Sequence, residues 1–331
     1  MNGHLNRMGL DCGTGNFVAA DDKNITLQRN AFISLDTATV NVRQLKMMNV
    51  PYIETNNRLY VVGKKAYEYA QIFNNKDLRR PMAQGLLNPS EQDAFPILKE
   101  IIGELVGSGS AADDDLIVYS IPGKPIDKVQ EIEYHEDILR SIIEALGHRT
   151  KSLNEGVALS YVGLADNELT GISISLGSGM CNIAIMYAGM AVITFSTTKG
   201  GDWIDENVAR DTGTSKAKAQ YTKENGGYSL IGTEERTMEQ QAIRTYYEAL
   251  IRYLLANIAK QFESTDTPNF PNPIPIVLGG GTVMVNGFLE VFKEQFKQKE
   301  FPIDISEIKI VDEPLTAVAR GCLIEANLEE K

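Results

Sequence analysis

The sequence predicts an α/β protein made of two duplicated domains around a nucleotide cleft, each with a smaller subdomain. Two glycine-rich turns carry this prediction, one in each half of the 331-residue chain, at residues 9–16 and 174–182. Each turn follows an apolar run and precedes β-prone residues, the pattern of a strand, a tight turn and a second strand. Glycine lets backbone N–H groups converge on an anion. Two such hairpins therefore indicate two similar domains that hold one polyphosphate.

A third glycine-rich site supports this interpretation. An apolar strand at 274–278 runs into Gly279, Gly280 and Gly281 and then into an amphipathic helix. A glycine turn at a helix N-terminus offers unpaired N–H groups to a nucleotide. Any one of these turns alone is more simply an ordinary glycine turn, so the prediction depends on their combination. No GxxxxGK[ST] occurs, and neither hairpin turn has the full GxGxxG spacing before a helix, which argues against a P-loop NTPase and a dinucleotide site.

The first half of the chain predicts one domain with a small insertion, and the helices follow from apolar residues at helical spacing. Its expected elements are a β-hairpin and a further strand in 9–36, an insertion at 37–75 with a strand at 58–63 and a helix at 64–72, a helix at 93–106, a loop at 107–115, a strand at 116–121 and a helix at 128–146.

The second half repeats this plan of hairpin, strand and helix. Its expected elements are three strands in 171–199, a helix at 202–211, a long helix at 237–262, a proline-rich loop at 268–275, a strand at 306–311 and a final helix that returns to the first domain. Residues 1–157 and 317–331 are predicted to form domain I, and residues 158–316 domain II, with a subdomain at about 206–268.

Several segments match one superfamily in the expected order. They are the first phosphate loop at 11–16, an inter-domain helix at 153–161, a second phosphate loop at 176–179, a Gly-Gly-Asp turn at 198–205, an adenosine motif at 278–281 and a second connecting segment at 311–321. The chain resembles the superfamily of actin, the heat-shock ATPases and the sugar kinases, whose domains have a ribonuclease H-like fold. The segments at 79–85 and 311–321 favour prokaryotic actins of the MreB and ParM type.

The resemblance implies a role for each matched residue. Asp11 is expected to hold Mg²⁺ through waters and to serve catalysis, and Glu155 to orient the attacking water. Without the resemblance, Glu155 would be taken as a helix N-cap or surface residue. The residues expected to bind the nucleotide are Gly13, Thr14, Gly15, Asn16, Gly177, Ser178, Gly179, Lys218, Gly279, Gly280 and Gly281.

Two positions depart from the superfamily pattern. Ser175 stands where most relatives have an aspartate, so the site loses one of its two usual carboxylates. We therefore expect weaker Mg²⁺ binding, slower hydrolysis, or both. Ser215 stands where relatives often have a glutamate that touches the nucleoside, in an A-E-x-x-K pattern whose lysine matches Lys218. ATP is the expected nucleotide, and GTP stays open.

Within the superfamily, the resemblance favours a slow ATPase that polymerises into head-to-tail cytoskeletal filaments. The alternative is a chaperone-like nucleotide switch or assembly factor of the same fold that does not polymerise. A sugar kinase ranks last, because no convincing catalytic aspartate for a sugar hydroxyl is found in the second half.

The amino-acid composition is typical of a globular protein, and its charge limits the classes of partner that the protein is expected to bind. The net charge of −12 and the absence of a Lys/Arg-rich block argue against direct nucleic-acid binding, whereas an adaptor protein stays compatible. Three separate cysteines and three histidines give no metal-binding spacing. The N-terminus lacks a secretory h-region, and no apolar run reaches the roughly 18 residues of a membrane span. A cytoplasmic protein is therefore expected.

Overall fold

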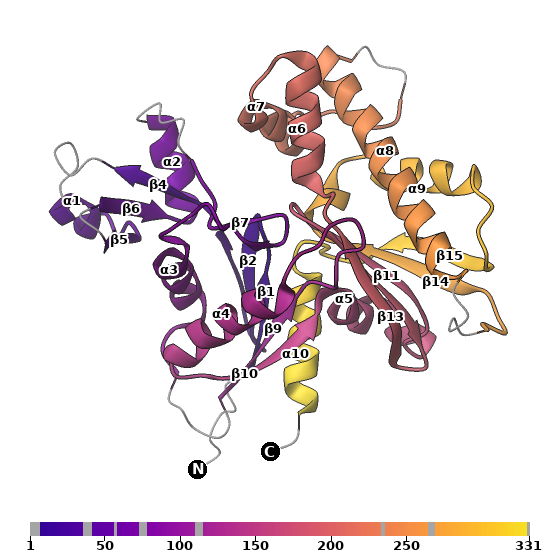
Figure 1. Cartoon of the computed structure of the whole chain (residues 1–331), viewed down its shortest axis with the longest axis horizontal. Coiled ribbons are helices and arrows are strands. Elements are labelled where there is room, and N and C mark those ends of the chain that lie inside the picture. Colours follow the sequence, from indigo (N-terminus) through magenta and orange to yellow (C-terminus); the bar gives the residue numbers. More distant parts are fainter. Residues whose placement is uncertain are drawn as a thin grey trace. The chain divides into compact units, whose positions relative to one another are not determined.

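The computed structural model describes residues 7–35, 42–55, 58–72, 78–109, 115–232, 236–263 and 269–329 (Figure 1). Its two five-stranded sheets and their helices confirm the predicted α/β class. The chain divides into two compact units: unit 1 comprises Met1–Ile121, Glu131–Leu153 and Cys322–Lys331, and unit 2 comprises Pro122–Gln130 and Asn154–Gly321. These bounds assign residues 122–130, 154–157 and 317–321 to unit 2, whereas the expected bounds of domain I include them.

Unit 1 is built on a sheet with the strand order β10-β9-β1-β2-β3. The central strand β1 pairs with β2 in antiparallel and with β9 in parallel orientation. The strands are β1 (Arg7–Cys12), β2 (Asn16–Ala20), β3 (Ile25–Arg29), β9 (Leu116–Ile121) and β10 (Arg149–Asn154). Helices α3 (Ala94–Val106) and α4 (Ile132–Ala145) pack on this sheet, and alternate β1 residues such as Met8 and Leu10 share their apolar core.

The insertion in unit 1 forms a small subdomain with its own sheet and core. Strands β4 (Phe32–Leu35), β6 (Arg58–Val62) and β5 (Tyr52–Thr55) pair in that order, with helices α1 (Val42–Met47) and α2 (Lys64–Ile72) beside them. The predicted strand at 58–63 and helix at 64–72 are present. Residues 37–41, 56–57 and 73–75 of the predicted insertion, and 110–114 of the predicted loop, lie outside the described residues.

A short hairpin follows the small subdomain. It consists of β7 (Met82–Ala83) and β8 (Leu86–Leu87), which are antiparallel and enclose the turn at Gln84 and Gly85. Gly85 has a φ of 80°, a conformation that glycine adopts without strain.

Unit 2 has the sheet order β13-β12-β11-β14-β15, with β11 antiparallel to β12 and parallel to β14. The strands are β11 (Gly171–Leu176), β12 (Cys181–Tyr187), β13 (Met190–Thr197), β14 (Ile274–Gly279) and β15 (Ile305–Ile310). The helices and 3₁₀ turns are α5 (Glu155–Gly163), η1 (Ala165–Asn167), α6 (Gly201–Thr212), α7 (Lys216–Asn225), α8 (Met238–Gln261), η2 (Gly281–Met284) and α9 (Phe288–Lys297). Helix α10 (Ala317–Leu328) begins in unit 2 and ends in unit 1.

The two faces of the unit 2 sheet differ in chemistry. One face, with Ile174, Leu176 and Ile183, joins an apolar core with residues of α6, α8 and α9. The other face carries Ser173 and Asn182 and packs against α5. This second face is the one that brings polar side chains to the ends of the strands.

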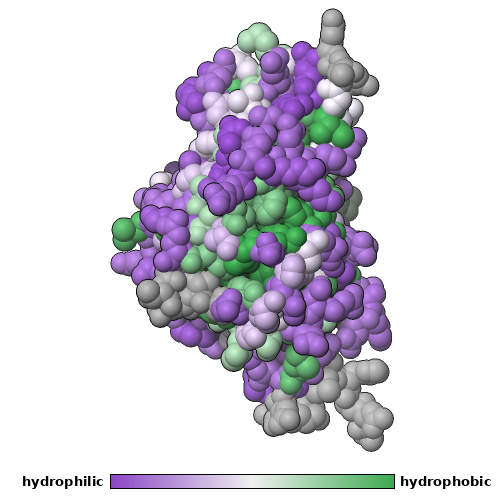
Figure 2. All heavy atoms as spheres, turned by 90° about the vertical axis from the view of Figure 1, so that its right-hand side faces the viewer, coloured by the Kyte–Doolittle hydropathy of each residue, from purple (hydrophilic) through white to green (hydrophobic). Residues whose placement is uncertain are grey.

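Aromatic rings extend the unit 2 core toward its surface. The half-buried Phe301 lies 5.1 Å from Phe296 and 6.2 Å from Phe262, measured between ring centroids. Figure 2 shows one face of the protein, on which hydrophobic residues gather near the middle and hydrophilic residues surround them. No helix within the described ranges combines the length and the apolar character that a membrane span needs.

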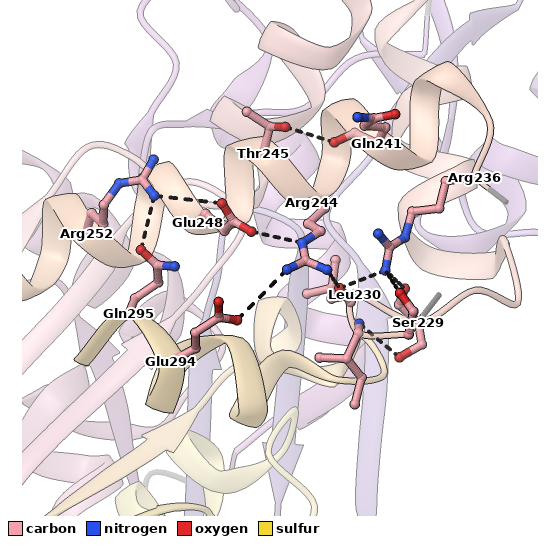
Figure 3. Close-up of polar contacts among 12 residues, drawn as sticks. Ser229, Leu230, Arg236, Gln241, Arg244, Thr245, Glu248, Arg252, Glu294 and Gln295 are labelled. Carbon is pink, nitrogen blue, oxygen red and sulfur yellow. Dashed lines mark hydrogen bonds and ion pairs between the residues drawn. The ribbon is translucent and has the colours of Figure 1, made fainter. Parts of the chain in front are cut away.

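An arginine cluster joins α8 to α9 and to the loop after α7 (Figure 3). Arg244 donates to the carbonyl of Leu230 over 2.9 Å and to Glu248 over 2.9 Å, and its guanidinium lies 3.9 Å from Glu294 of α9. Arg252 bonds Gln295 of α9 over 3.0 Å. These contacts fix the long helix to its neighbours within unit 2.

Candidate functional site

The first glycine turn, here glycine loop 1 (residues 12–16), joins β1 to β2 in unit 1. A Cβ on Gly13 would lie 2.7 Å from the carbonyl oxygen of Asn16, so the turn has no room for a side chain there. Asn30 fixes the loop by two hydrogen bonds. Its Nδ2 donates to the Gly13 carbonyl and its backbone N–H donates to the Gly15 carbonyl, each over 3.1 Å. Asn30 is fully buried, so this clamp is part of the fold.

Two side chains of glycine loop 1 have different surroundings. Thr14 is buried, and its Oγ1 accepts a 2.9 Å hydrogen bond from the backbone N–H of Gly85 in the β7–β8 turn. Asn16 is half-buried, and its Oδ1 accepts no hydrogen bond from any described residue. Thr14 therefore fixes the loop to the neighbouring hairpin, whereas the buried Oδ1 of Asn16 is left without a hydrogen bond from the described residues.

Asp11 lies near the end of β1, directly before this loop. Its Oδ1 accepts a 3.0 Å hydrogen bond from Oγ of Ser120 at the end of β9, and that Oγ accepts from the Cys12 N–H over 2.9 Å. Burial raises the pKa of the Asp11 carboxyl to about 6, while the Ser120 hydrogen bond opposes the rise. Asp11 is thus a largely ionised carboxylate at neutral pH, next to the phosphate loop candidate.

The second glycine turn, here glycine loop 2 (residues 177–180), joins β11 to β12 in unit 2. The Gly177 N–H bonds the Met180 carbonyl over 2.9 Å, which closes the turn. The N–H groups of Gly201 and Asp202, where α6 begins, bond the carbonyls of Gly177 and Ser178 over 3.0 and 2.8 Å. The Gly-Gly-Asp turn therefore supports glycine loop 2 from outside.

The third glycine turn follows β14. Gly280 has a φ of 90°, and a Cβ there would lie 2.4 Å from the Leu176 carbonyl oxygen. Its N–H bonds the Pro314 carbonyl over 2.7 Å. Thr282 donates to the Gly177 carbonyl over 2.9 Å, so this turn and glycine loop 2 are directly linked. Residues 177–179 and 279–281 are brought together at the ends of two adjacent strands.

Glu155 is the first residue of α5. The side chain of the N-cap Asn154 accepts from the N–H groups of Gly156 and Val157, so the cap role that Glu155 could have served belongs to its neighbour. Oε2 of Glu155 accepts a 2.8 Å hydrogen bond from Nδ2 of Asn182 on β12. A carboxylate at a helix N-terminus is also stabilised by the helix dipole.

The two departures from the superfamily pattern have structural consequences. Ser175 is buried on β11, in register with Asn182 on one side and Gly279 on the other. Its side chain brings no charge to this position. Ser215 is the N-cap of α7, and its Oγ accepts from the Lys218 N–H over 3.2 Å.

Lys218 lies on α7 and faces α8. Its side chain is 61% exposed, and its Nζ lies 2.8 Å from Oε1 of Glu239. Lys223, one and a half turns later, is 9% exposed; its Nζ lies 2.7 Å from Asp205 and 2.9 Å from the Gly201 carbonyl beside glycine loop 2. Of the two lysines, Lys223 is the one in contact with the glycine-loop region.

The sequence-predicted residues thus form two groups. Unit 1 brings together Asp11 and residues 13–16, and unit 2 brings together Glu155 and the residues of its two glycine turns; Lys218 lies apart from these turns in its contacts. Sequence reasoning missed Asn30, Asn182 and Lys223 as supporting residues. Within the described parts of the chain, no cluster of three or more His, Cys, Asp or Glu side chains that could hold a metal ion occurs.

Comparison with solved structures shows which proteins share this fold. A protomer of the MamK double helical filament matches with a TM-score of 0.73 at 19% identity, over 98% of this chain and 99% of that chain. MreB5 of Spiroplasma citri bound to AMPPNP matches with a TM-score of 0.68 at 18% identity, over 96% and 94%. The ethanolamine utilization protein EutJ from Carboxydothermus hydrogenoformans matches with a TM-score of 0.54 at 17% identity, over 96% and 89%.

These likenesses confirm the predicted actin-like fold of the MreB type. A comparison with curated protein sequences finds no match. The model of the Volactin family matches residues 7–326, which is nearly the whole chain. The chain therefore belongs to the Volactin family.

Proposed function

We propose that this chain binds ATP with Mg²⁺ and polymerises into filaments as a slow actin-like ATPase. The observation that carries the proposal is the repetition of one feature: each unit ends an inner strand in a glycine hairpin. A Cβ on the first glycine of the turn would lie 2.7 Å (Gly13) or 3.0 Å (Gly177) from a backbone carbonyl oxygen. Similarity to MamK, which was solved as a double helical filament, supports self-association. Similarity to MreB5 structures bound to AMPPNP and ADP supports nucleotide binding.

The residues divide the chemistry between them. Glycine loops 1 and 2 would offer backbone N–H groups to the phosphates, with the Asn16 amide as a polar side chain. The ionisable Asp11, supported by Ser120, fits a hydrated Mg²⁺, because this ion takes few protein carboxylates and keeps several waters. Mg²⁺, when bound, would neutralise phosphate charge. Glu155 would hold the attacking water as a hydrogen-bond acceptor.

Nucleoside contact is the role we propose for the turn at 279–281 and for a lysine of α7. Lys218 is the candidate from the sequence resemblance. The contacts favour Lys223 beside it, because its ammonium already bonds the carbonyl of Gly201 next to glycine loop 2. The contacts of these two lysines do not distinguish ATP from GTP.

A nucleotide switch that does not polymerise is the second candidate. Ser175 favours it, because this buried position lacks the charge that most relatives of the superfamily supply for Mg²⁺. Such a switch would bind nucleotide, change conformation and act on a partner such as an adaptor protein without forming filaments.

High-speed pelleting tests the proposal. Purified protein is centrifuged across a concentration series with Mg-ATP, Mg-GTP, Mg-ADP or no nucleotide, and phosphate release is followed in parallel. We expect a pellet above a critical concentration only with a nucleoside triphosphate, and electron microscopy of that pellet should show filaments. No pellet, despite nucleotide binding measured by calorimetry, would replace the filament proposal with the switch. Absence of binding would reject both.

A further inference from the structure

Asn182 joins Glu155 to a segment of backbone on the opposite side of the amide. Its Nδ2 donates to Oε2 of Glu155 over 2.8 Å, and its Oδ1 accepts from the backbone N–H of Gly123 over 2.8 Å. Asn182 is fully buried, so neither bond is weakened by exchange with water. Both polar ends of the amide are satisfied by groups of opposite hydrogen-bonding character.

An amide side chain of this length suits these two neighbours. A carboxylate such as Glu155 accepts hydrogen bonds when ionised, and a backbone N–H only donates. The amide supplies one donor and one acceptor at the required ends. An aspartate at position 182 would satisfy the Gly123 N–H but would set a second carboxylate against Glu155, which disfavours ionisation of the pair.

Gly123 belongs to the segment Pro122–Gln130, through which the chain passes from β9 in unit 1 to α4. The segment is fastened to β13: Ser196 Oγ donates to the Gly123 carbonyl over 2.7 Å, and the Ile126 N–H bonds the Ser196 carbonyl over 3.0 Å. A Cβ on Gly123 would lie 2.8 Å from backbone atoms of Phe195. This close packing against β13 fixes the position of the Gly123 N–H relative to the Asn182 side chain.

Two other ionisable groups near Asn182 are Cys181 and Asp127. Burial raises the pKa of the Cys181 thiol well above its usual range, and the nearby carboxylates of Glu155 and Asp127 raise it further. Asp127 is itself engaged: it accepts from the Thr198 N–H over 3.0 Å and from the Tyr253 hydroxyl over 2.9 Å. The thiol therefore stays neutral, whereas Asn182, the next residue of β12, donates a hydrogen bond to Glu155.

We propose that Asn182 is a positioning residue that orients the Glu155 carboxylate and couples it to the segment Pro122–Gln130. Movement of this connecting segment would reach Glu155 through two hydrogen bonds, without a change in the glycine loops. The proposal rests on the proposed function in one respect, the role of Glu155 in holding the attacking water. The hydrogen bonds that link Glu155, Asn182 and Gly123 are present in the protein without nucleotide.

The test follows the ionisation of Glu155 in the full chain by ¹³C NMR of carboxyl-labelled glutamate, with the Glu155→Gln spectrum as assignment. In Asn182→Asp we expect the pKa of Glu155 to rise by at least about one unit, a tenfold change in its proton affinity. Asn207→Asp is the matched control: Asn207 is also a buried asparagine of unit 2, and within the described ranges its amide donates to the Trp203 carbonyl and not to a carboxylate. Its spectrum should show the wild-type pKa of Glu155.

A second variant covers failure of Asn182→Asp to fold. In Asn182→Ala, the Gly123 amide loses its acceptor, so hydrogen exchange across residues 122–130 should accelerate by about tenfold or more, and the pKa of Glu155 should rise because a donor to its charged form is lost. Unchanged Glu155 titration and unchanged exchange in folded variants would overturn the proposal.

Turnover separates this proposal from the function on which it builds. If the wild type hydrolyses ATP, Asn182→Asp should lower kcat by about tenfold or more with little change in KM, and should move the acidic limb of the pH profile upward. If the wild type binds ATP but releases no phosphate, the ATPase proposal fails, and the NMR and exchange results still decide the role of Asn182.

Discussion

Lys223 and Asp205 form a buried ion pair beside glycine loop 2, with 2.7 Å between Nζ and Oδ2. The pair joins α7 to α6, and Nζ also donates to the Gly201 carbonyl. Burial raises the pKa of Asp205 to about 6, while the charge and hydrogen bond of Lys223 act against that rise. The lysine is therefore what keeps this carboxyl ionised at neutral pH.

Lys223→Met should destabilise unit 2 by about 3 kcal/mol at pH 7.5, because it leaves a buried carboxylate without its cation. The pKa of Asp205 is raised on folding, so its contribution to stability is complete below about pH 4 and is lost as pH rises toward 6. Without Lys223, that loss should continue to higher pH. Urea unfolding of the variant from pH 5 to 8 measures both effects.

Lys218→Met is the matched control for this experiment. Lys218 lies on the same helix and also pairs with a carboxylate, but its side chain is 61% exposed. We expect its stability to change by less than about 1 kcal/mol, with the pH dependence of the wild type. Equal losses in the two variants would contradict a special role for the buried pair.

Arg244→Met should cost about 1–2 kcal/mol, because the Leu230 carbonyl and Glu248 each lose a donor in a partly buried setting (Figure 3). Arg252→Met removes a similar arginine whose side chain is 53% exposed, and should cost less than about 0.5 kcal/mol. Denaturant midpoints at constant slope give both values. A larger loss of stability for Arg252→Met than for Arg244→Met would show that the bond from Arg252 to Gln295 of α9 contributes more than the contacts of Arg244.

Asp11→Ala should abolish Mg-dependent nucleotide binding in calorimetry, because it removes the carboxylate proposed for hydrated Mg²⁺. Binding measured with a chelator should change little. Ser120→Ala is the finer variant: loss of its hydrogen bond should raise the pKa of Asp11 above about 6, so Mg-dependent affinity should fall at pH 7 and recover at pH 8. Unchanged affinity in Asp11→Ala would remove this residue from the site.

The glycine turns were predictable from sequence because the backbone itself leaves no alternative at them. Gly13 and Gly280 each face a carbonyl oxygen closer than any Cβ tolerates, so the residue type reports the local geometry. Helix α3 was predictable for a similar reason, since its apolar residues follow helical spacing and are buried. At the glycine turns and in α3, the residue types of the segment itself are sufficient to indicate its conformation.

Long-range contacts account for what the sequence did not indicate. The helix expected from residue 128 begins at Ile132, because Pro125 pairs with Ser196 on β13 and the segment before the helix is fixed there. Helix α7 buries Ala219 alone, so no apolar period marks it. The roles of Asn182 and Lys223 arise from partners on other elements, and neither residue type is unusual in its own segment.

Ser175→Asp should speed phosphate release by about tenfold if the missing carboxylate limits Mg²⁺ binding or hydrolysis. The position is buried between Asn182 and Gly279 in the sheet register, so the new charge would need Mg²⁺ to offset its burial. Stability of the variant should accordingly increase when Mg-nucleotide is added. Ser175→Ala keeps the site neutral and serves as control, and turnover equal in all three proteins would show that the carboxylate is not limiting.

Gly321→Ala should destabilise the protein by about 3 kcal/mol or more, because a Cβ there would lie 1.8 Å from the Ala158 carbonyl oxygen and α10 could not approach α5. Gly103→Ala offers the opposite case within another helix. A Cβ at Gly103 meets only the Leu146 side chain, at 3.6 Å, so the higher helix propensity of alanine should add about 0.5–1 kcal/mol. Thermal unfolding of both variants measures the contrast. Similar effects of the two substitutions would contradict the close contact of α10 with α5, and with it the structural reason for glycine in the segment at 311–321.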